Sequence, residues 1–125
     1  MPNAPIVPTE SQEQCVLVEW ANLAALKTPE LNLLYHIPNG GHRNKAVAAK
    51  LKAEGVKSGV PDFCLPVARR QYHGLYIELK RTRGGRLKQE QKLWITALTE
   101  QGYLALSCRG FDEARQALLD YLSLN

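Results

Sequence analysis

Residues 59–80 read Gly59-Val60-Pro61-Asp62-Phe63-Cys64-Leu65-Pro66-Val67, then a polar bend, then Leu75-Tyr76-Ile77-Glu78-Leu79-Lys80. Each half is a short apolar run that carries a carboxylate, which is unusual for a strand. Because side chains alternate between the two faces of a strand, Glu78 and Lys80 point the same way and Leu79 points the other way. If the two runs pair as a hairpin, Asp62 comes close to Glu78. Two carboxylates and one ammonium group then gather on one face of a sheet.

Carboxylates in a sheet are costly unless something neutralises their charge. A hard divalent cation does so, because Mg²⁺ prefers oxygen ligands and takes one or two carboxylates from the protein. The pair Asp62 and Glu78 therefore predicts a site for Mg²⁺ or Mn²⁺. The alternative is a purely structural ion pair with Lys80.

The order Pro-Asp, spacer, Glu-x-Lys is the signature of the PD-(D/E)xK nucleases, and the chain most closely resembles the VRR-NUC group of that superfamily. The segments that carry the resemblance are residues 37–41, 55–62 and 74–80, together with Gln91 and Trp94. The resemblance implies an α/β, restriction-endonuclease-like fold with a small mixed sheet flanked by helices. It also implies a stand-alone nuclease domain over residues 10–125, after an extended, proline-rich arm over residues 1–9.

The same resemblance implies the roles of the site residues. Asp62 and Glu78 are expected to hold the metal, with the backbone carbonyl of Leu79 as a further ligand. Lys80 is expected to orient the attacking water and to stabilise charge in the transition state. Gln91, a polar residue on an apolar helical stripe, is expected to support the site.

A third acidic ligand is expected near the start of the first helix. Glu10 matches the family's Glu-Ser-Gln-x-Gln-like setting, with Gln14 one turn further on, and Glu13 is the competing candidate. Both acids are equally consistent with a simpler role, since acidic residues in a first turn stabilise the helix dipole. Thr9 is the expected N-cap.

Charge is unevenly distributed along the chain. Residues 39–92 hold 13 Lys or Arg and 4 Asp or Glu, a net charge of +9, whereas the remainder carries −5. A basic block around two carboxylates is what a phosphate-backbone binder with a metal site needs, although a solvated basic surface has the same composition. The candidate DNA contacts are Arg43, Lys45, Arg81, Arg83, Arg86 and Lys88. The paired glycines 40 and 41 are a plain turn or a loop that lets a phosphate approach closely.

Helical and strand patterns alternate along the chain. Helices are expected over residues 10–27, 42–54, 87–101 and 111–122, and strands over residues 33–37, 59–67, 75–80 and 103–107. Three scattered cysteines favour neither a disulfide framework nor a zinc site. With no secretory signal and no membrane span in the pattern, we expect a cytoplasmic protein, of phage or bacterial type by resemblance.

Family members of this kind resemble Holliday junction resolvases that act as homodimers on branched DNA. We therefore expect a homodimer that cuts four-way junctions. The apolar residues that one small core does not readily accommodate together are Trp20, Trp94, Tyr103, Tyr121 and Leu122. The alternatives are a flap-type or general DNA nuclease, and a non-catalytic DNA-binding module of the same fold.

Overall fold

The computed structural model describes residues 6–39 and 44–125. In order, the elements are α1 (Glu10–Ala24), the 3₁₀ helix η1 (Pro29–Leu33), β1 (Tyr35–His36), α2 (Lys45–Ala53), β2 (Phe63–Leu65), β3 (Leu75–Lys80), α3 (Gln89–Glu100), β4 (Leu104–Arg109) and α4 (Gly110–Leu122). Thr9 caps α1 as expected. Its side-chain hydroxyl accepts from the backbone N–H of Gln12, and the side-chain oxygen of Gln12 accepts from the backbone N–H of Thr9.

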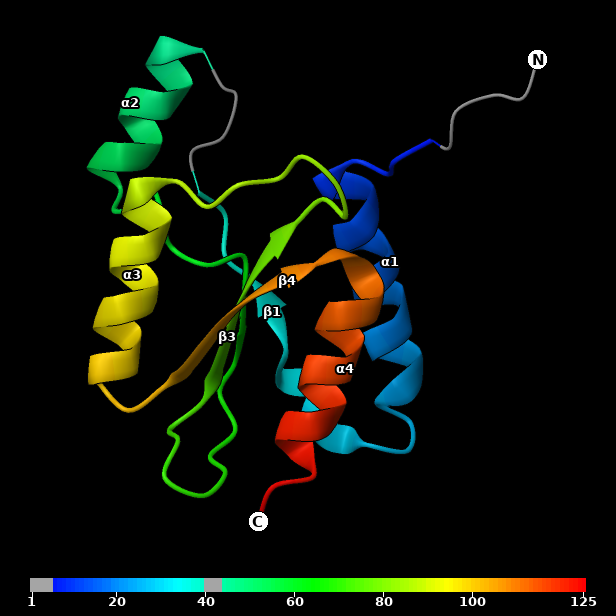
Figure 1. The fold of residues 1–125 in the computed structure, drawn as a ribbon. Coiled ribbons are helices and arrows are strands. Elements are labelled where there is room, and N and C mark those ends of the chain that lie inside the picture. The colour runs from blue at the N-terminus through cyan, green and yellow to red at the C-terminus, as the bar shows by residue number, and fades with distance from the viewer. Residues whose placement is uncertain (1–5, 40–43) are drawn as a thin grey trace, which may run out of the picture.

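The four strands form one mixed sheet in the order β1-β2-β3-β4. β2 pairs with β3 in antiparallel register, Phe63 opposite Ile77, so the expected hairpin is present. β4 runs parallel to β3 after the α3 crossover, with Glu78 opposite Ser107. Figure 1 shows α1 and α4 together on one side of the sheet and α3 on the other, which confirms the expected α/β fold with helices on both faces.

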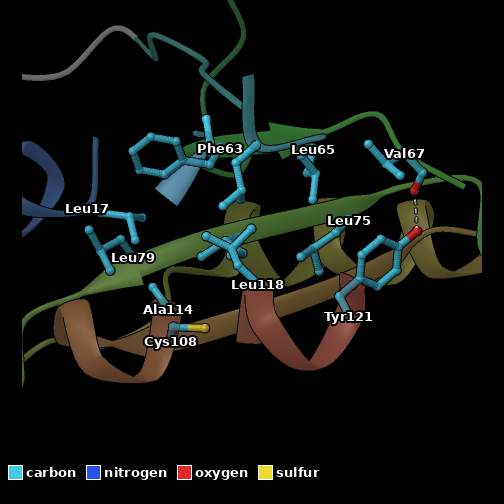
Figure 2. Close-up of a cluster of buried hydrophobic side chains, with 13 residues drawn as sticks. Leu17, Phe63, Leu65, Val67, Leu75, Leu79, Cys108, Ala114, Leu118 and Tyr121 are labelled. Carbon is cyan, nitrogen blue, oxygen red and sulfur yellow. Dashed lines mark hydrogen bonds between the residues drawn. The ribbon is translucent and has the colours of Figure 1, made fainter. Parts of the chain in front are cut away.

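The hydrophobic core lies between the sheet and the α1–α4 pair (Figure 2). Its buried members are Leu17, Ala25, Leu31, Phe63, Leu65, Val67, Leu75, Ile77, Leu79, Cys108, Ala114, Leu118 and Tyr121. The hydroxyl of Tyr121 donates to the Val67 carbonyl at 2.6 Å, which satisfies the one polar atom of a side chain that is 1% exposed. Alternate residues of β3 thus point into this core and leave Glu78 and Lys80 on the opposite face.

Several expectations need correction. The first helix, expected over residues 10–27, ends at Ala24, and a 3₁₀ helix follows from Pro29. Tyr121 belongs to the core, and Trp20 and Leu122 pack against it, so the supposed surplus of apolar residues shrinks. β1 and β2 are shorter than their apolar runs. The paired glycines, the start of the expected helix at His42 and the DNA contact Arg43 lie outside the described residues.

Within residues 6–39 and 44–125, no helix has the length and apolar character needed to cross a membrane.

Candidate functional site

Strand β3 carries the two charged residues at the centre of the site. Glu78 is 2% exposed and Lys80 is 6% exposed, although both point away from the main core. The Nζ atom of Lys80 lies 3.5 Å from Oε2 of Glu78. The alternation of β3 predicted this shared face, and the pair confirms it.

Asp62 stands immediately before β2, and its side chain takes the place of a strand partner for β3. Its Oδ2 atom accepts a hydrogen bond from the Leu79 N–H at 2.7 Å. Its backbone carbonyl accepts from the Ile37 N–H at 2.7 Å, and the Nδ1 atom of His36 lies 2.8 Å from the same oxygen. Contacts from both neighbouring segments therefore fix this residue, and the Asp62 carboxylate is held beside Glu78.

Gln91, in the first turn of α3, is buried, and both the nitrogen and the oxygen of its side-chain amide form hydrogen bonds. Its Nε2 donates to Oε2 of Glu78 at 3.3 Å, and its Oε1 accepts from the Lys88 N–H at 2.8 Å. Lys88 has no side-chain acceptor with which to cap the helix. The Gln91 side chain therefore caps the helix in place of Lys88, because its Oε1 accepts from the Lys88 N–H. Its Nε2 donates to Glu78 and so helps to orient that carboxylate.

Burial and a neighbouring carboxylate outweigh the Lys80 ammonium in the electrostatics of Glu78. Burial, and then the nearby Asp62 carboxylate, raise the pKa of Glu78 from 4.5 to about 8, although the Lys80 ammonium opposes the rise. Its Oε1 atom is buried and has no hydrogen-bond partner among the described residues. An orphaned oxygen beside a second carboxylate is the donor set that a hard cation satisfies.

The two acids of the first helical turn have different positions. Oε1 of Glu10 lies 4.0 Å from Nζ of Lys80, so Glu10 borders the site. Glu13 instead is buried, and its Oε2 accepts from the Phe111 N–H at the start of α4 at 2.6 Å. Glu13 therefore anchors α1 to α4, as an acid at a helix N-terminus does. Of the two candidates, Glu10 is the one that faces Lys80.

The site thus brings together Glu10, Asp62, Glu78, Lys80 and Gln91. Within the described part of the chain, no three Asp, Glu, His or Cys side chains gather closely enough to hold a metal by themselves. A cation here would need water or backbone oxygens as well, which is usual for Mg²⁺.

Basic side chains surround this end of the sheet. Arg81, Arg83, Arg86 and Lys88 are exposed on the segment between β3 and α3. Figure 1 shows that segment passing close to the start of α1, and the Arg81 guanidinium donates to the Val7 carbonyl at 3.4 Å. Lys45 is exposed on α2, a helix without a buried residue.

Sequence reasoning missed two residues of this region. Arg109 ends β4 opposite Lys80 and donates to the Gly85 carbonyl at 3.1 Å, which ties the basic segment to the sheet. His36 supports Asp62 through its backbone carbonyl. Arg109 could not readily be found from the sequence. Its place beside Lys80 depends on the parallel register of β3 and β4, which is set by the connection through α3.

Comparisons with known proteins agree with this geometry. Residues 8–112 match the VRR-NUC domain family. A solved structure described as a "VRR_NUC domain protein" is 32% identical in sequence, with a TM-score of 0.81 over 96% of this chain and 93% of that one. A comparison with curated proteins gives no match.

Proposed function

This chain belongs to the VRR-NUC family of nuclease domains, and from that premise we propose that it is a metal-dependent endonuclease acting on branched DNA. The observation that carries the proposal is the buried carboxylate of Glu78, which has an unpartnered oxygen beside Asp62 and an ammonium 3.5 Å away. Burying such a carboxylate in its charged form costs stability, and a bound cation offsets that cost.

Each site residue has a defined task in this proposal. Asp62 and Glu78 hold Mg²⁺ or Mn²⁺, with Glu10 and the Leu79 carbonyl as further ligands. When bound, the cation supplies an acidified water and neutralises charge on the phosphoryl oxygens. Lys80 orients the attacking water and stabilises the charge that builds up on the phosphate. Gln91 keeps the Glu78 carboxylate in one orientation.

DNA binding would depend on the basic segment between β3 and α3. Arg81, Arg83, Arg86 and Lys88 are exposed next to the site, where they can contact phosphates on both sides of the bond to be cut. Lys45, exposed on α2, is a further candidate contact, and Arg43 remains a candidate from the sequence alone.

We further propose a homodimer that makes paired cuts in four-way junctions. A junction presents two equivalent strands related by a two-fold axis, and a C₂ dimer supplies two active sites with that symmetry. Leu23, Leu26, Leu33 and Tyr35, which lie between the end of α1 and β1, are between 51% and 84% exposed. Side chains of this kind favour contact with a second copy.

A cleavage panel tests the proposal. Labelled four-way junctions, flaps, splayed arms and linear duplexes are incubated with Mn²⁺ or with EDTA, and light scattering over a concentration range gives the assembly state. We expect metal-dependent, symmetric cuts in the junction and a dimer at micromolar concentrations. If the protein is a monomer and cuts flaps better than junctions, the resolvase-like hypothesis is wrong and a flap-type nuclease takes its place. If it binds DNA but cuts none of these substrates, it is a non-catalytic DNA-binding module.

A further inference from the structure

We propose that a cavity next to the metal-binding residues receives one unpaired nucleobase of the DNA, an inference that rests on the proposed nuclease function. The cavity has a volume of about 720 Å³ and lies between the first turns of α1, the start of α4 and the segment after β3. This volume falls within the range of roughly 300–1,000 Å³ that is typical of small-molecule sites.

The residues that line the cavity come from the same segments as two residues of the site. Glu13 lines it from the same helical turn that carries Glu10, and Thr82 lines it two residues beyond Lys80. A nucleotide whose phosphate lies against Lys80 and the basic segment therefore has this cavity beside its base.

The lining is mostly apolar, with Ile6, Val16 and Phe111 among its residues. Bases stack on aromatic rings and fill apolar pockets without regard to sequence. The Phe111 ring is held in place by two contacts: Trp20 packs against it in a T-shaped arrangement with ring centroids 6.3 Å apart, and the Arg115 guanidinium lies over the ring, 5.7 Å from its centroid. A rigid apolar wall of this kind suits a flat ligand.

Glu13 is a buried acidic residue in the lining of the cavity. It is more than nine-tenths buried, and its Oε2 accepts from the Phe111 N–H. Gly110 makes this arrangement possible, because at φ +79° a Cβ atom there would lie 2.5 Å from Thr82.

Charged side chains in the lining favour a base over a phosphate. Glu13, Asp112 and Glu113 line the cavity together with one cation, Arg109, so carboxylates outnumber cations among its described lining residues. This excess of carboxylates disfavours an anionic phosphate, and carboxylate oxygens accept hydrogen bonds from N–H groups. The exocyclic amino groups of cytosine, adenine and guanine are such donors, and so is the ring N3–H of an unpaired thymine. We therefore expect an unpaired base to bind more tightly than an abasic site.

The test uses substitutions at two valines of α1. V16W fills the cavity, and V18W is the matched control, because Val18 is also exposed but does not line it. Binding is measured in EDTA on branched DNA with an unpaired 2-aminopurine, dC, dT or abasic site at the branch. The fluorescence of 2-aminopurine reports stacking without any need for cleavage.

For the wild type and V18W, we expect a fluorescence change and binding of dC about 5- to 100-fold tighter than binding of the abasic site, the range that one stacked base supplies. V16W should lose both effects and still nick the abasic substrate with Mn²⁺ at the wild-type rate. Equal binding of dC and abasic DNA by the wild type would overturn the inference. A V16W protein that still binds dC more tightly than abasic DNA would also overturn it. The same holds if V16W loses the preference only because its assembly state has changed. If the wild type nicks none of these substrates with Mn²⁺, the proposed function fails instead.

Discussion

The side-chain amide of Gln91 joins the start of α3 to the Glu78 carboxylate of β3, accepting from the Lys88 N–H at 2.8 Å and donating to Glu78 at 3.3 Å. One residue thus closes a helix terminus and orients a buried carboxylate. The position of the carboxylate therefore depends on how α3 begins, and a change in this helix can alter the site without touching the strand.

Replacing Gln91 with methionine should weaken both stability and cleavage. The substitution keeps the volume but leaves the Lys88 N–H without its acceptor and Glu78 without its amide donor, a loss of about 1–3 kcal/mol in the free energy of unfolding. Gln89→Met is the control, because Gln89 is exposed in the same turn. Denaturant unfolding and cleavage assays should separate the two variants, and equal behaviour would argue against a supporting role for Gln91.

The metal-free protein should lose stability as the pH rises. Burial and Asp62 raise the pKa of Glu78 to about 8, so the folded protein holds this proton more tightly than the unfolded chain does. The resulting stabilisation is complete below pH 4.5 and is lost as the pH rises through about 8. Unfolding temperatures in EDTA should therefore fall more steeply for the wild type than for Glu78→Gln.

Mg²⁺ or Mn²⁺ should reverse that loss, since a cation replaces the proton as the partner of Glu78. The groups that face Glu78 are Asp62, Lys80 and Gln91, and only the variant at position 78 removes the titration itself. A wild type and a Glu78→Gln protein with parallel pH profiles would mean that Glu78 titrates normally.

The two acids of α1 should respond differently to substitution. Glu10→Gln should lower metal-dependent cleavage and leave the unfolding free energy unchanged, because Glu10 is half exposed and borders Lys80. Glu13→Ala should destabilise the protein by about 1–3 kcal/mol, because it leaves the Phe111 N–H without its acceptor. Glu13→Gln keeps an acceptor oxygen and should retain more cleavage activity than Glu10→Gln. The reverse ranking would make Glu13 the third ligand.

The basic segment should control the salt dependence of DNA binding. Arg83→Ala and Arg86→Ala each remove one cation that can neutralise a phosphate, so each should reduce the slope of log K against log salt by about 0.9. Arg70→Ala is the control, since Arg70 is exposed in the bend that precedes β3, whereas the basic segment follows it. Titrations at several salt concentrations measure the slopes. Identical slopes for all three variants would place the DNA elsewhere.

Much of the fold could be predicted from residues 59–80. Period-two alternation placed Glu78 and Lys80 on one face, and the hairpin brought Asp62 to them. The hydrophobic periodicity predicted the order of helices and strands, and it singled out Gln91 as a polar residue on an apolar stripe, to which the resemblance gave a role. These features depend on local patterns, and local patterns survive in the folded chain.

Other features depend on packing between distant segments, which the sequence pattern does not record. The hydrogen bond between Glu13 and Phe111 spans 98 positions, and the one between Arg109 and Gly85 spans 24. The sequence pattern does not distinguish Tyr121 from other partly apolar residues of the last helix. In the structure its hydroxyl donates to the Val67 carbonyl, and its ring lies in the core. The cavity beside the site likewise arises only where α1, α4 and the segment after β3 meet.

The most direct test of the metal site is the cleavage of a labelled four-way junction by the wild type, Asp62→Asn and Glu78→Gln, each with Mn²⁺ or Mg²⁺ and with EDTA. We predict cuts by the wild type only when the metal is present. Both variants should remain folded, bind the junction in EDTA at least as tightly as the wild type, and leave it uncut. Wild-type cleavage rates in either variant, or cutting in EDTA, would contradict the assignment of these two carboxylates to a catalytic metal site.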